Sequence, residues 1–228
     1  MKRHVPNLFT CCNLVCGCLG IVFVLEERDI PAAYFVWLAC IFDFFDGFAG
    51  RMLKVTSPIG RELDSLADVV SFGVLPSLVM YKMISSSTDS AVIPYAALAI
   101  AVFSALRLAI FNVDETQRDS FRGLNTPANS LFITALPLLY NEVGRWLYDT
   151  SVLVAITVIF SLLLVSRIEF FALKFKNFSW HDNKLRFTFL ILAVLLLIVL
   201  QIAAIPVIII LYILLSLMDN ALAPKKIS

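Results

Sequence analysis

The stretch DFFDGFAGRMLKVTSPIGRELDSLAD, from Asp43 to Asp68, contains four aspartates, three glycines and two arginines between long apolar runs. A helix turns by about 100° per residue. The polar residues before the chain turn near Val55 therefore fall on one face of the first helix, and those after it fall on one face of the next helix. The first face holds Asp43, Asp46, Gly47 and Gly50, and the second holds Gly60, Asp64 and Asp68. If these faces meet, four carboxylates converge on one cavity.

Four carboxylates cannot be buried together as anions without compensation, because desolvation and mutual repulsion would force protons onto some of them. Mg²⁺ or Mn²⁺ would remove both costs, since hard divalent ions take oxygen ligands and share their remaining positions with phosphate. The three glycines would let a flat ligand approach the backbone closely. Arg51 and Arg61 stand at the mouth, where a guanidinium can bind phosphate with two bonds. The pattern therefore predicts a metal and nucleotide diphosphate site.

Two other readings of the acidic stretch remain. The aspartates could be helix-end residues that face water, with the glycines serving helix packing. The cluster could also be the ion path of a cation transporter, although that function leaves the glycine spacing and the arginines unexplained.

The composition predicts what must position these residues. Of 228 residues, 60% are hydrophobic and 15% are charged, against roughly 25% charged in soluble domains. We expect an all-α polytopic membrane protein, in one domain of residues 1–228. Apolar runs predict eight spans, at 8–26, 31–50, 63–83, 90–111, 126–142, 150–172, 186–203 and 205–222. The last two are separated only by Gln201 and Pro206, so six or seven spans remain an alternative.

The basic residues predict the orientation of these spans. Of the 18 Lys and Arg residues, only Arg28, Lys82 and Arg145 fall on the opposite side from the rest. We therefore expect both termini, and the loop that follows Arg51, in the cytoplasm. The site would face the cytoplasm from the inner cell membrane. We expect no nucleic-acid partner.

The acidic stretch resembles the signature of the CDP-alcohol phosphotransferase family, Asp-x-x-Asp-Gly-x-x-Ala-Arg followed by Gly-x-x-x-Asp-x-x-x-Asp. One position departs, because Gly50 stands where alanine is usual. The resemblance implies that Asp43, Asp46 and Asp64 bind the metals and that Asp68 is the general base, also touching metal. It also implies a homodimer, and a six-span core of about 1–173 with two further spans in 174–228. The implied CDP-binding residues in this stretch are Gly47, Arg51 and Gly60, with Arg61 beside them.

Three further stretches resemble the phosphatidylserine synthase group of this family. PNLFTCCNLVCG matches its opening through Pro6, Asn7, Thr10, Asn13 and Gly17, and we expect the first four to help line the CDP site. RLAIFN matches through Arg107 and Asn112. FRGLNTPA matches a third segment, but Asn125 replaces the usual proline. The resemblance implies transfer of a phosphatidyl group from CDP-diacylglycerol to L-serine.

Arg107 is the candidate for recognising serine. An arginine within a membrane span is costly without a partner, and a serine carboxylate could accept two bonds from it. Pairing with one of the aspartates is an equal alternative, and Asn112 is included with Arg107 as a substrate residue. The same chemistry with glycerol 3-phosphate or inositol phosphate stays open. A prenyltransferase would also use Mg²⁺ and aspartates, but with a different spacing.

Overall fold

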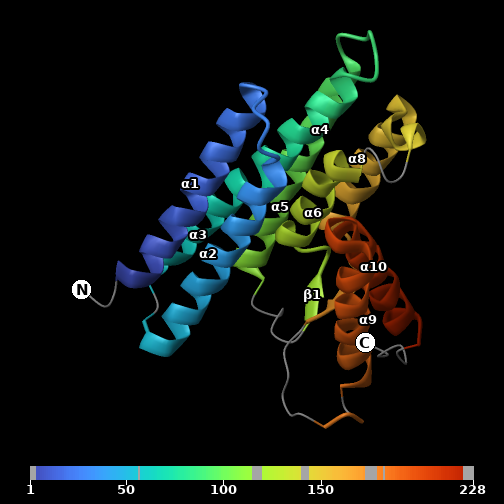
Figure 1. The fold of residues 1–228 in the computed structure, drawn as a ribbon. Helices are drawn as coiled ribbons and strands as arrows, with labels where there is room; N and C mark the ends of the chain where they lie inside the picture. Colours follow the sequence, from blue (N-terminus) through green and yellow to red (C-terminus); the bar gives the residue numbers. More distant parts are fainter. Residues whose placement is uncertain are drawn as a thin grey trace.

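The computed structural model describes residues 4–55, 57–114, 120–139, 144–172, 179–181 and 183–222. These residues form a bundle of helices with one short two-stranded sheet (Figure 1). Within those ranges, five helical runs are long and apolar enough to cross a membrane, and two further apolar helices are shorter. The molecule is therefore a polytopic membrane protein, as the composition predicts.

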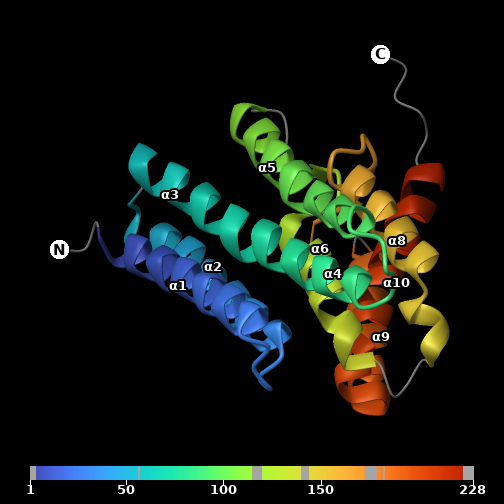
Figure 2. The same ribbon diagram turned by 90° about the horizontal axis from the view of Figure 1, so that it is seen from above.

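The first two helices form a hairpin. Helix α1 spans Val5–Leu25 and α2 spans Ala32–Leu53, and the two lie side by side (Figures 1 and 2). Lys54 ends α2 with a φ of 51°, in the left-handed region that closes many helices. The amide of the next residue, Val55, donates to the carbonyl of Gly50 at 3.0 Å. The chain therefore turns sharply and leads directly into the next helix.

The third run is not one regular helix. Helix α3 spans Pro58–Asp68, a π-helix η2 follows over Val69–Val74, and α4 spans Leu75–Ser85. Ser57 caps α3 by accepting a bond from the Gly60 amide, and a proline takes the first helical position, as is common at helix starts. The run passes between the α1–α2 hairpin and α5 (Figure 2). The sequence predicted an uninterrupted span over residues 63–83, and the π-helix within it was not predicted.

The fourth run and the segment after it supply the other walls of the site. A 3-10 helix η3 over Ile93–Ala97 leads into α5, Leu98–Val113. Helix α6, Thr126–Ala135, continues as the 3-10 helix η4, Leu136–Leu139. Asn125 caps α6, because its Oδ1 accepts a 2.7 Å bond from the Ala128 amide. The residue that departs from the family pattern therefore stabilises the start of a helix.

A small antiparallel sheet is the main departure from the all-α prediction. Strand β1, Ser120–Arg122, pairs with β2, Glu169–Phe171. A 3-10 helix η5, Arg145–Tyr148, precedes α8, Thr150–Leu164. The predicted sixth span, 150–172, is therefore too long at its end. After α8 the backbone hydrogen bonds of the chain are made to the segment before α6 instead of along a helix.

The chain ends in a second hairpin. Helix α9 spans Lys184–Leu200, a 3-10 turn η6 covers Gln201–Ala203, and α10 spans Ala204–Leu222. Gln201 has a φ of 50°, and the two helices pack against each other (Figure 1). The prediction of a break near Gln201 is confirmed. The total of eight membrane crossings stays a prediction, because α6 and α8 are short for a span of about 20 residues.

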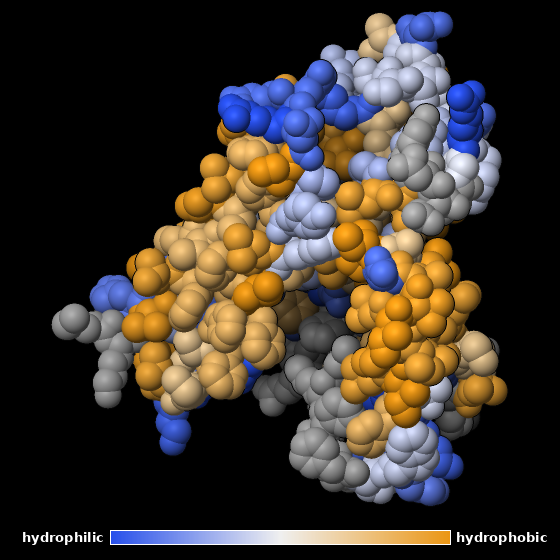
Figure 3. Space-filling model, viewed as in Figure 1, coloured by the Kyte–Doolittle hydropathy of each residue, from blue (hydrophilic) through white to orange (hydrophobic). Residues whose placement is uncertain are grey.

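The outer surface is apolar over much of its area. Large apolar side chains such as Phe44 and Ile198 are 61% and 71% exposed, and Figure 3 shows hydrophobic atoms gathered over the hairpins at both sides of the molecule. Such faces suit contact with lipid. At one end, Lys82 Nζ donates to Glu27 Oε1 at 2.7 Å and lowers the pKa of that carboxyl group. This contact joins the α1–α2 loop to α4. The predicted cytoplasmic orientation stays a prediction.

Candidate active site

Three of the four predicted aspartates form one cluster. Asp43 comes from α2, and Asp64 and Asp68 come from α3. One carboxylate oxygen from each lies within 4.8 Å of the others. Oδ1 of Asp64 is buried without a hydrogen-bond partner among the described residues. A buried oxygen of this kind is costly unless a cation accompanies it. The donor set consists of hard carboxylate oxygens, so the cluster can hold a metal ion that prefers oxygen ligands.

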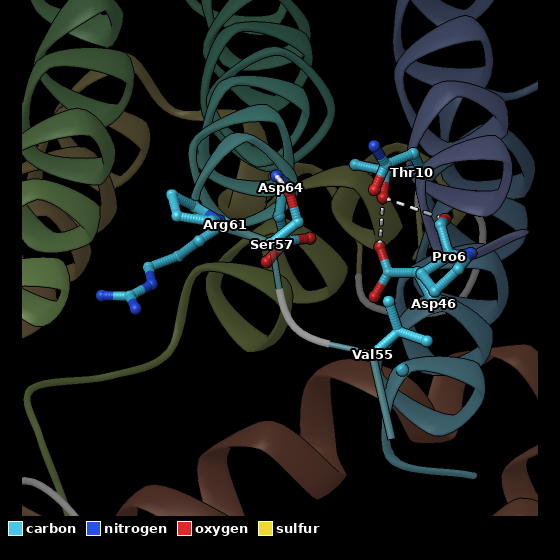
Figure 4. Close-up of a pocket in the computed structure, with 11 residues that line it drawn as sticks. Pro6, Thr10, Asp46, Val55, Ser57, Arg61 and Asp64 are labelled. Atoms are coloured by element: carbon cyan, nitrogen blue, oxygen red, sulfur yellow. Dashed lines mark hydrogen bonds between the residues drawn. The ribbon is translucent and has the colours of Figure 1, made fainter. Parts of the chain in front are cut away.

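Asp46 lies beside this cluster and is held differently. Its Oδ2 accepts a 2.9 Å hydrogen bond from Oγ1 of Thr10, and the same hydroxyl lies 3.2 Å from the carbonyl of Pro6. Figure 4 shows Thr10 and Asp46 pointing toward one another across the α1–α2 hairpin. Asp46 is therefore positioned by the first helix, whereas the other three aspartates are grouped between the second and third.

A pocket of about 340 Å³ opens where α1, α2 and α3 meet. We call it the Thr10 pocket. Asp64 lines it together with Asp46, so it adjoins the carboxylate cluster, and Arg61 lines it from the other side of the turn. In Figure 4 the Arg61 side chain points away from the Thr10–Asp46 pair. The remaining lining residues are Pro6, Asn7, Thr10, Gly50, Val55, Ser57, Pro58 and Gly60.

A second and larger space, about 590 Å³, lies on the other side of Asp64. We call it the acidic cavity, because Asp43, Asp64 and Asp68 all line it. Arg61 lines both spaces and marks the boundary between them. The other residues of the acidic cavity come from α3, α5 and the start of α6: Ser65, Arg107, Leu108, Phe111, Asn112, Asp114, Asn125, Thr126 and Pro127. The two spaces share the carboxylate of Asp64, so a molecule in each could meet the other beside that residue.

A side chain from α1 holds one member of the cluster, and a side chain from α5 reaches the residue beside another. Asn13 Nδ2 donates to Oδ1 of Asp68 at 3.0 Å, and Ser71 in the π-helix donates to the carbonyl of Asn13 at 2.9 Å. Asn112 Nδ2 donates to Ser65 Oγ at 2.8 Å. Predicted site residues from α1 and α5 therefore reach α3. Asn13 acts on a carboxylate directly, whereas Asn112 reaches only the serine beside Asp64.

The glycines have more than one task. Gly50 and Gly60 line the Thr10 pocket, as expected for close approach of a ligand. A Cβ on Gly60 would also lie 3.0 Å from Oδ1 of Asn7, so this glycine allows α1 to approach α3. Neither Gly47 nor Arg51 lines the Thr10 pocket or the acidic cavity. A Cβ on Gly47 would lie 3.5 Å from Nη1 of Arg51, so these two residues are close to each other.

Arg107 reaches the acidic cavity from the wall opposite α3. It is 8% exposed, and its Nε has no hydrogen-bond partner among the described residues. Its guanidinium carbon lies 5.3 Å from the ring centroid of Phe111, a favourable cation–π contact. Within the described ranges Arg107 forms no ion pair with an aspartate, although Asp68 lines the same cavity. A buried cation with an unpaired donor is suited to an anionic ligand.

Sequence reasoning missed several residues that shape the site. Ser71 holds the backbone of Asn13, and Ser57 caps α3 beside the Thr10 pocket. Asn125 and Thr126 line the acidic cavity from the start of α6. Only Asn125 carried a signal in the sequence, because it departs from the pattern that the neighbouring residues match.

Comparison with known proteins agrees with this site. Residues 3–163 match the family described as CDP-alcohol phosphatidyltransferase. The chain belongs to this family. The match includes α1, all four aspartates, Arg107 and α8 as far as residue 163, and it leaves out β2, α9 and α10. The family description names CDP-alcohol phosphatidyl transfer as the shared reaction.

Several curated relatives share most of the chain. A CDP-diacylglycerol–serine O-phosphatidyltransferase of Bacillus subtilis is 34% identical over 169 residues, which are 74% of this chain and 90% of the relative. A protein of the same name from Helicobacter pylori is 33% identical, over 77% of this chain and 74% of its own length. Another, from Methanocaldococcus jannaschii, is 30% identical over 73% of both chains. Bacterial and archaeal relatives that carry the same enzyme name are thus similar to most of this chain.

Proposed function

We propose that this protein transfers the phosphatidyl group of CDP-diacylglycerol to the hydroxyl group of L-serine, giving phosphatidylserine and CMP. The observation that carries the proposal is the position of the carboxylate cluster between two spaces of different character. The Thr10 pocket offers backbone, small residues and Arg61 to a nucleotide. The acidic cavity offers a buried arginine to a small charged alcohol. The names of the relatives support serine as that alcohol.

In this proposal the CDP part of the donor lies in the Thr10 pocket. Asn7 and Thr10 line it from α1, and Gly60 and Arg61 line it from the start of α3. Asn13, also predicted for the CDP site, does not line this pocket and donates to Asp68 instead. Arg61 would bind a phosphate oxygen, as a guanidinium does with two parallel bonds. Gly47 and Arg51 are assigned to the same ligand by family resemblance. Their place on α2, next to Asp46 and Gly50, supports a role near the diphosphate.

Asp43, Asp46 and Asp64 would hold the divalent metal, with Asp68 touching it. When bound, Mg²⁺ or Mn²⁺ neutralises the diphosphate and stabilises the departing CMP. The three-carboxylate group supports Asp43 and Asp64 as ligands. Asp46 is not in that group, but its carboxylate lines the same pocket as Asp64. Thr10 occupies one oxygen of Asp46 and leaves the other for a further partner.

Asp68 is the proposed general base. Its carboxylate takes the proton of the serine hydroxyl group, and the serine oxygen forms a bond with the phosphorus atom that carries diacylglycerol. The bond between that phosphorus and the bridging oxygen breaks, and CMP leaves with the electron pair. Asn13 holds Oδ1 of Asp68 at 3.0 Å, so Oδ2 is the oxygen left to face the alcohol. A base held in this way needs little reorientation before it accepts the proton.

Arg107 is the proposed ligand of the serine carboxylate. It lines the acidic cavity together with Asp68 and Asn112, so the hydroxyl of a bound serine could face the base. Arg107 also lines a smaller adjoining space of about 200 Å³ with Arg122 and Arg167. Arginine on several sides would suit a phosphate as well as a carboxylate. Glycerol 3-phosphate and inositol phosphate therefore stay as alternative acceptors.

The acceptor assay tests the proposal. Purified protein with Mn²⁺ and radiolabelled CDP-diacylglycerol is given L-serine, glycerol 3-phosphate or inositol phosphate in separate reactions, and lipid products are separated. We expect label in phosphatidylserine only. Label in phosphatidylglycerophosphate or in a phosphoinositide would contradict serine as the acceptor while leaving the family chemistry in place.

A matched pair of variants tests the role of Arg107. Arg107→Lys keeps a cation but loses the two-bond geometry, and Arg107→Gln loses the charge as well. We expect the KM for serine to rise in both, more in Gln, while the KM for CDP-diacylglycerol changes little. Arg145→Gln, in η5 and away from both spaces, is the control. Equal effects on both substrates would mean that Arg107 only stabilises the fold.

A further inference from the structure

A third space adjoins the acidic cavity on the side away from the Thr10 pocket. It measures about 400 Å³, and we call it the lateral groove. Its walls come from α2, α6, β2 and both helices of the C-terminal hairpin. Figure 3 shows the molecule hollowed between the apolar surfaces of α2 and of the C-terminal hairpin. The lining residues are Cys40, Asp43, Asn125, Pro127, Ala128, Leu131, Phe171, Ala172, Phe189, Ile209 and Tyr212.

The lateral groove is apolar except at one end. Asp43 and Asn125 supply its strongly polar side chains. The hydroxyl of Tyr212 donates to the carbonyl of Phe171 at 3.0 Å, so that tyrosine presents its ring. The rings of Phe171, Phe189 and Tyr212 contact one another, with centroids 4.9 to 5.8 Å apart. They form a continuous aromatic wall that holds no charge to attract a polar ligand.

The polar end of the groove is part of the site already described. Asp43, Asn125 and Pro127 line both the lateral groove and the acidic cavity. Cys40 stands one helical turn before Asp43 on α2 and lies within the groove. A ligand could therefore place a charged group beside the carboxylate cluster and extend a hydrocarbon chain past Cys40 without leaving the protein.

We propose that the lateral groove binds one acyl chain of the CDP-activated lipid and orients the reacting phosphorus toward Asp68. The proposal rests on the proposed function for its donor. The acyl chain gains little free energy when it moves from the bilayer into the groove, since lipid tails are as apolar as leucine side chains. The benefit is orientation of the head group and selection of chain shape by packing against the aromatic wall.

The source of this wall makes the groove a determinant of specificity. Phe189, Ile209 and Tyr212 belong to α9 and α10, outside the residues 3–163 that match the family. The nucleotide and metal residues all lie inside that match. The segment outside the family match therefore faces the part of the substrate that varies most among lipids.

The test measures chain preference without any alcohol. Purified protein with Mn²⁺ is mixed with equal amounts of CDP-dipalmitoylglycerol and CDP-dioctanoylglycerol, and the lipids retained after gel filtration are quantified by mass spectrometry. A second mixture replaces the dioctanoyl lipid with one that carries methyl-branched chains. Because no acceptor is present, a failure of serine as substrate leaves this measurement valid and separates the two proposals.

Two substitutions change the groove in opposite directions. Leu131→Trp fills it from α6, and Phe189→Ala widens it from α9. A single methylene in a hydrophobic enzyme pocket commonly changes selectivity about tenfold or more. We expect Leu131→Trp to lower the dipalmitoyl-to-dioctanoyl ratio by about tenfold on the same basis. Phe189→Ala should raise the retention of branched chains. Because both lipids compete for the same protein sample, the ratio of retained lipids does not depend on how much of a variant stays folded.

Leu195→Trp is the matched control. Leu195 lies on α9, is 52% exposed and does not line the groove. We expect its ratios to equal those of the unmodified protein. Unchanged ratios in both groove variants, or an equal shift in Leu195→Trp, would overturn the proposal. A lower dipalmitoyl-to-dioctanoyl ratio in Leu131→Trp and a higher retention of branched chains in Phe189→Ala, with no shift in the control, would support it.

Discussion

Asn13 on α1 donates a 3.0 Å hydrogen bond to Oδ1 of Asp68 on α3, so residues 55 positions apart are joined at the centre of the site. The bond has a consequence for experiment. An asparagine at position 68 could still accept it through Oδ1. The substitution Asp68→Asn therefore removes the charge and the proton acceptor while the packing around Asn13 is retained.

Asp68→Asn and Asp46→Asn should separate a base from a metal ligand. We expect Asp68→Asn to lose about 10²- to 10⁴-fold in turnover, the usual effect of removing a general base. Binding of CDP with Mn²⁺ should be retained, because the proton moves only in the transition state. Asp46→Asn should weaken that binding itself. Titration calorimetry with CDP and Mn²⁺ measures both. Equal loss of binding in the two variants would make Asp68 chiefly a metal ligand.

Removal of the metal should abolish activity. The cluster of Asp43, Asp64 and Asp68 holds three carboxylates close together, and no cation from the described residues pairs with them. We expect no product in EDTA and recovery when Mn²⁺ or Mg²⁺ is added in excess. Release of CMP is the measurement. Full activity in the chelator would contradict the metal site.

Two glycines with similar backbones should respond differently to alanine. Gly123 and Gly144 have φ values of 78° and 86°, so alanine at either costs roughly 1–3 kcal/mol in backbone strain. A Cβ on Gly123 would also lie 2.2 Å from the carbonyl oxygen of Leu164. Gly123→Ala should therefore lower the melting temperature clearly more than Gly144→Ala. Equal shifts would mean that the end of α8 can move away.

The orientation of the chain can be tested with a reporter. The distribution of Lys and Arg predicts both termini in the cytoplasm. A reporter fused after Ser228 should react only with cytoplasmic reagents, and a cysteine label in the loop near Asp29 should react only from outside. The five native cysteines must first be replaced. An external C-terminus would show that the predicted count of eight spans is wrong.

Much of the site could be predicted because helical periodicity assigns residues to faces. Asp43, Asp64 and Asp68 met as the spacing indicated. The separate position of Asp46 depends on Thr10, which only the approach of α1 to α2 reveals. The pairing of β1 with β2 could not be predicted, because it joins segments about 50 residues apart through backbone bonds. The lateral groove could not be predicted either, because α9 and α10 reach the site only through tertiary packing. The homodimer stays a prediction from the family resemblance.

The π-helix η2 makes the third run depend on how six residues are wound rather than on their chemistry. A π turn holds one more residue than an α turn, so it offsets the angular phase of everything that follows. Before the π turn, Asp64 and Asp68 face α1 and α2. After it, Met80 and Ile84 face the hydrophobic core. If Val69–Val74 were wound as a regular α-helix with the same number of residues, one half would rotate against the other by about 100°. Either the carboxylates or the core residues would then face the wrong way, although no functional side chain had been touched.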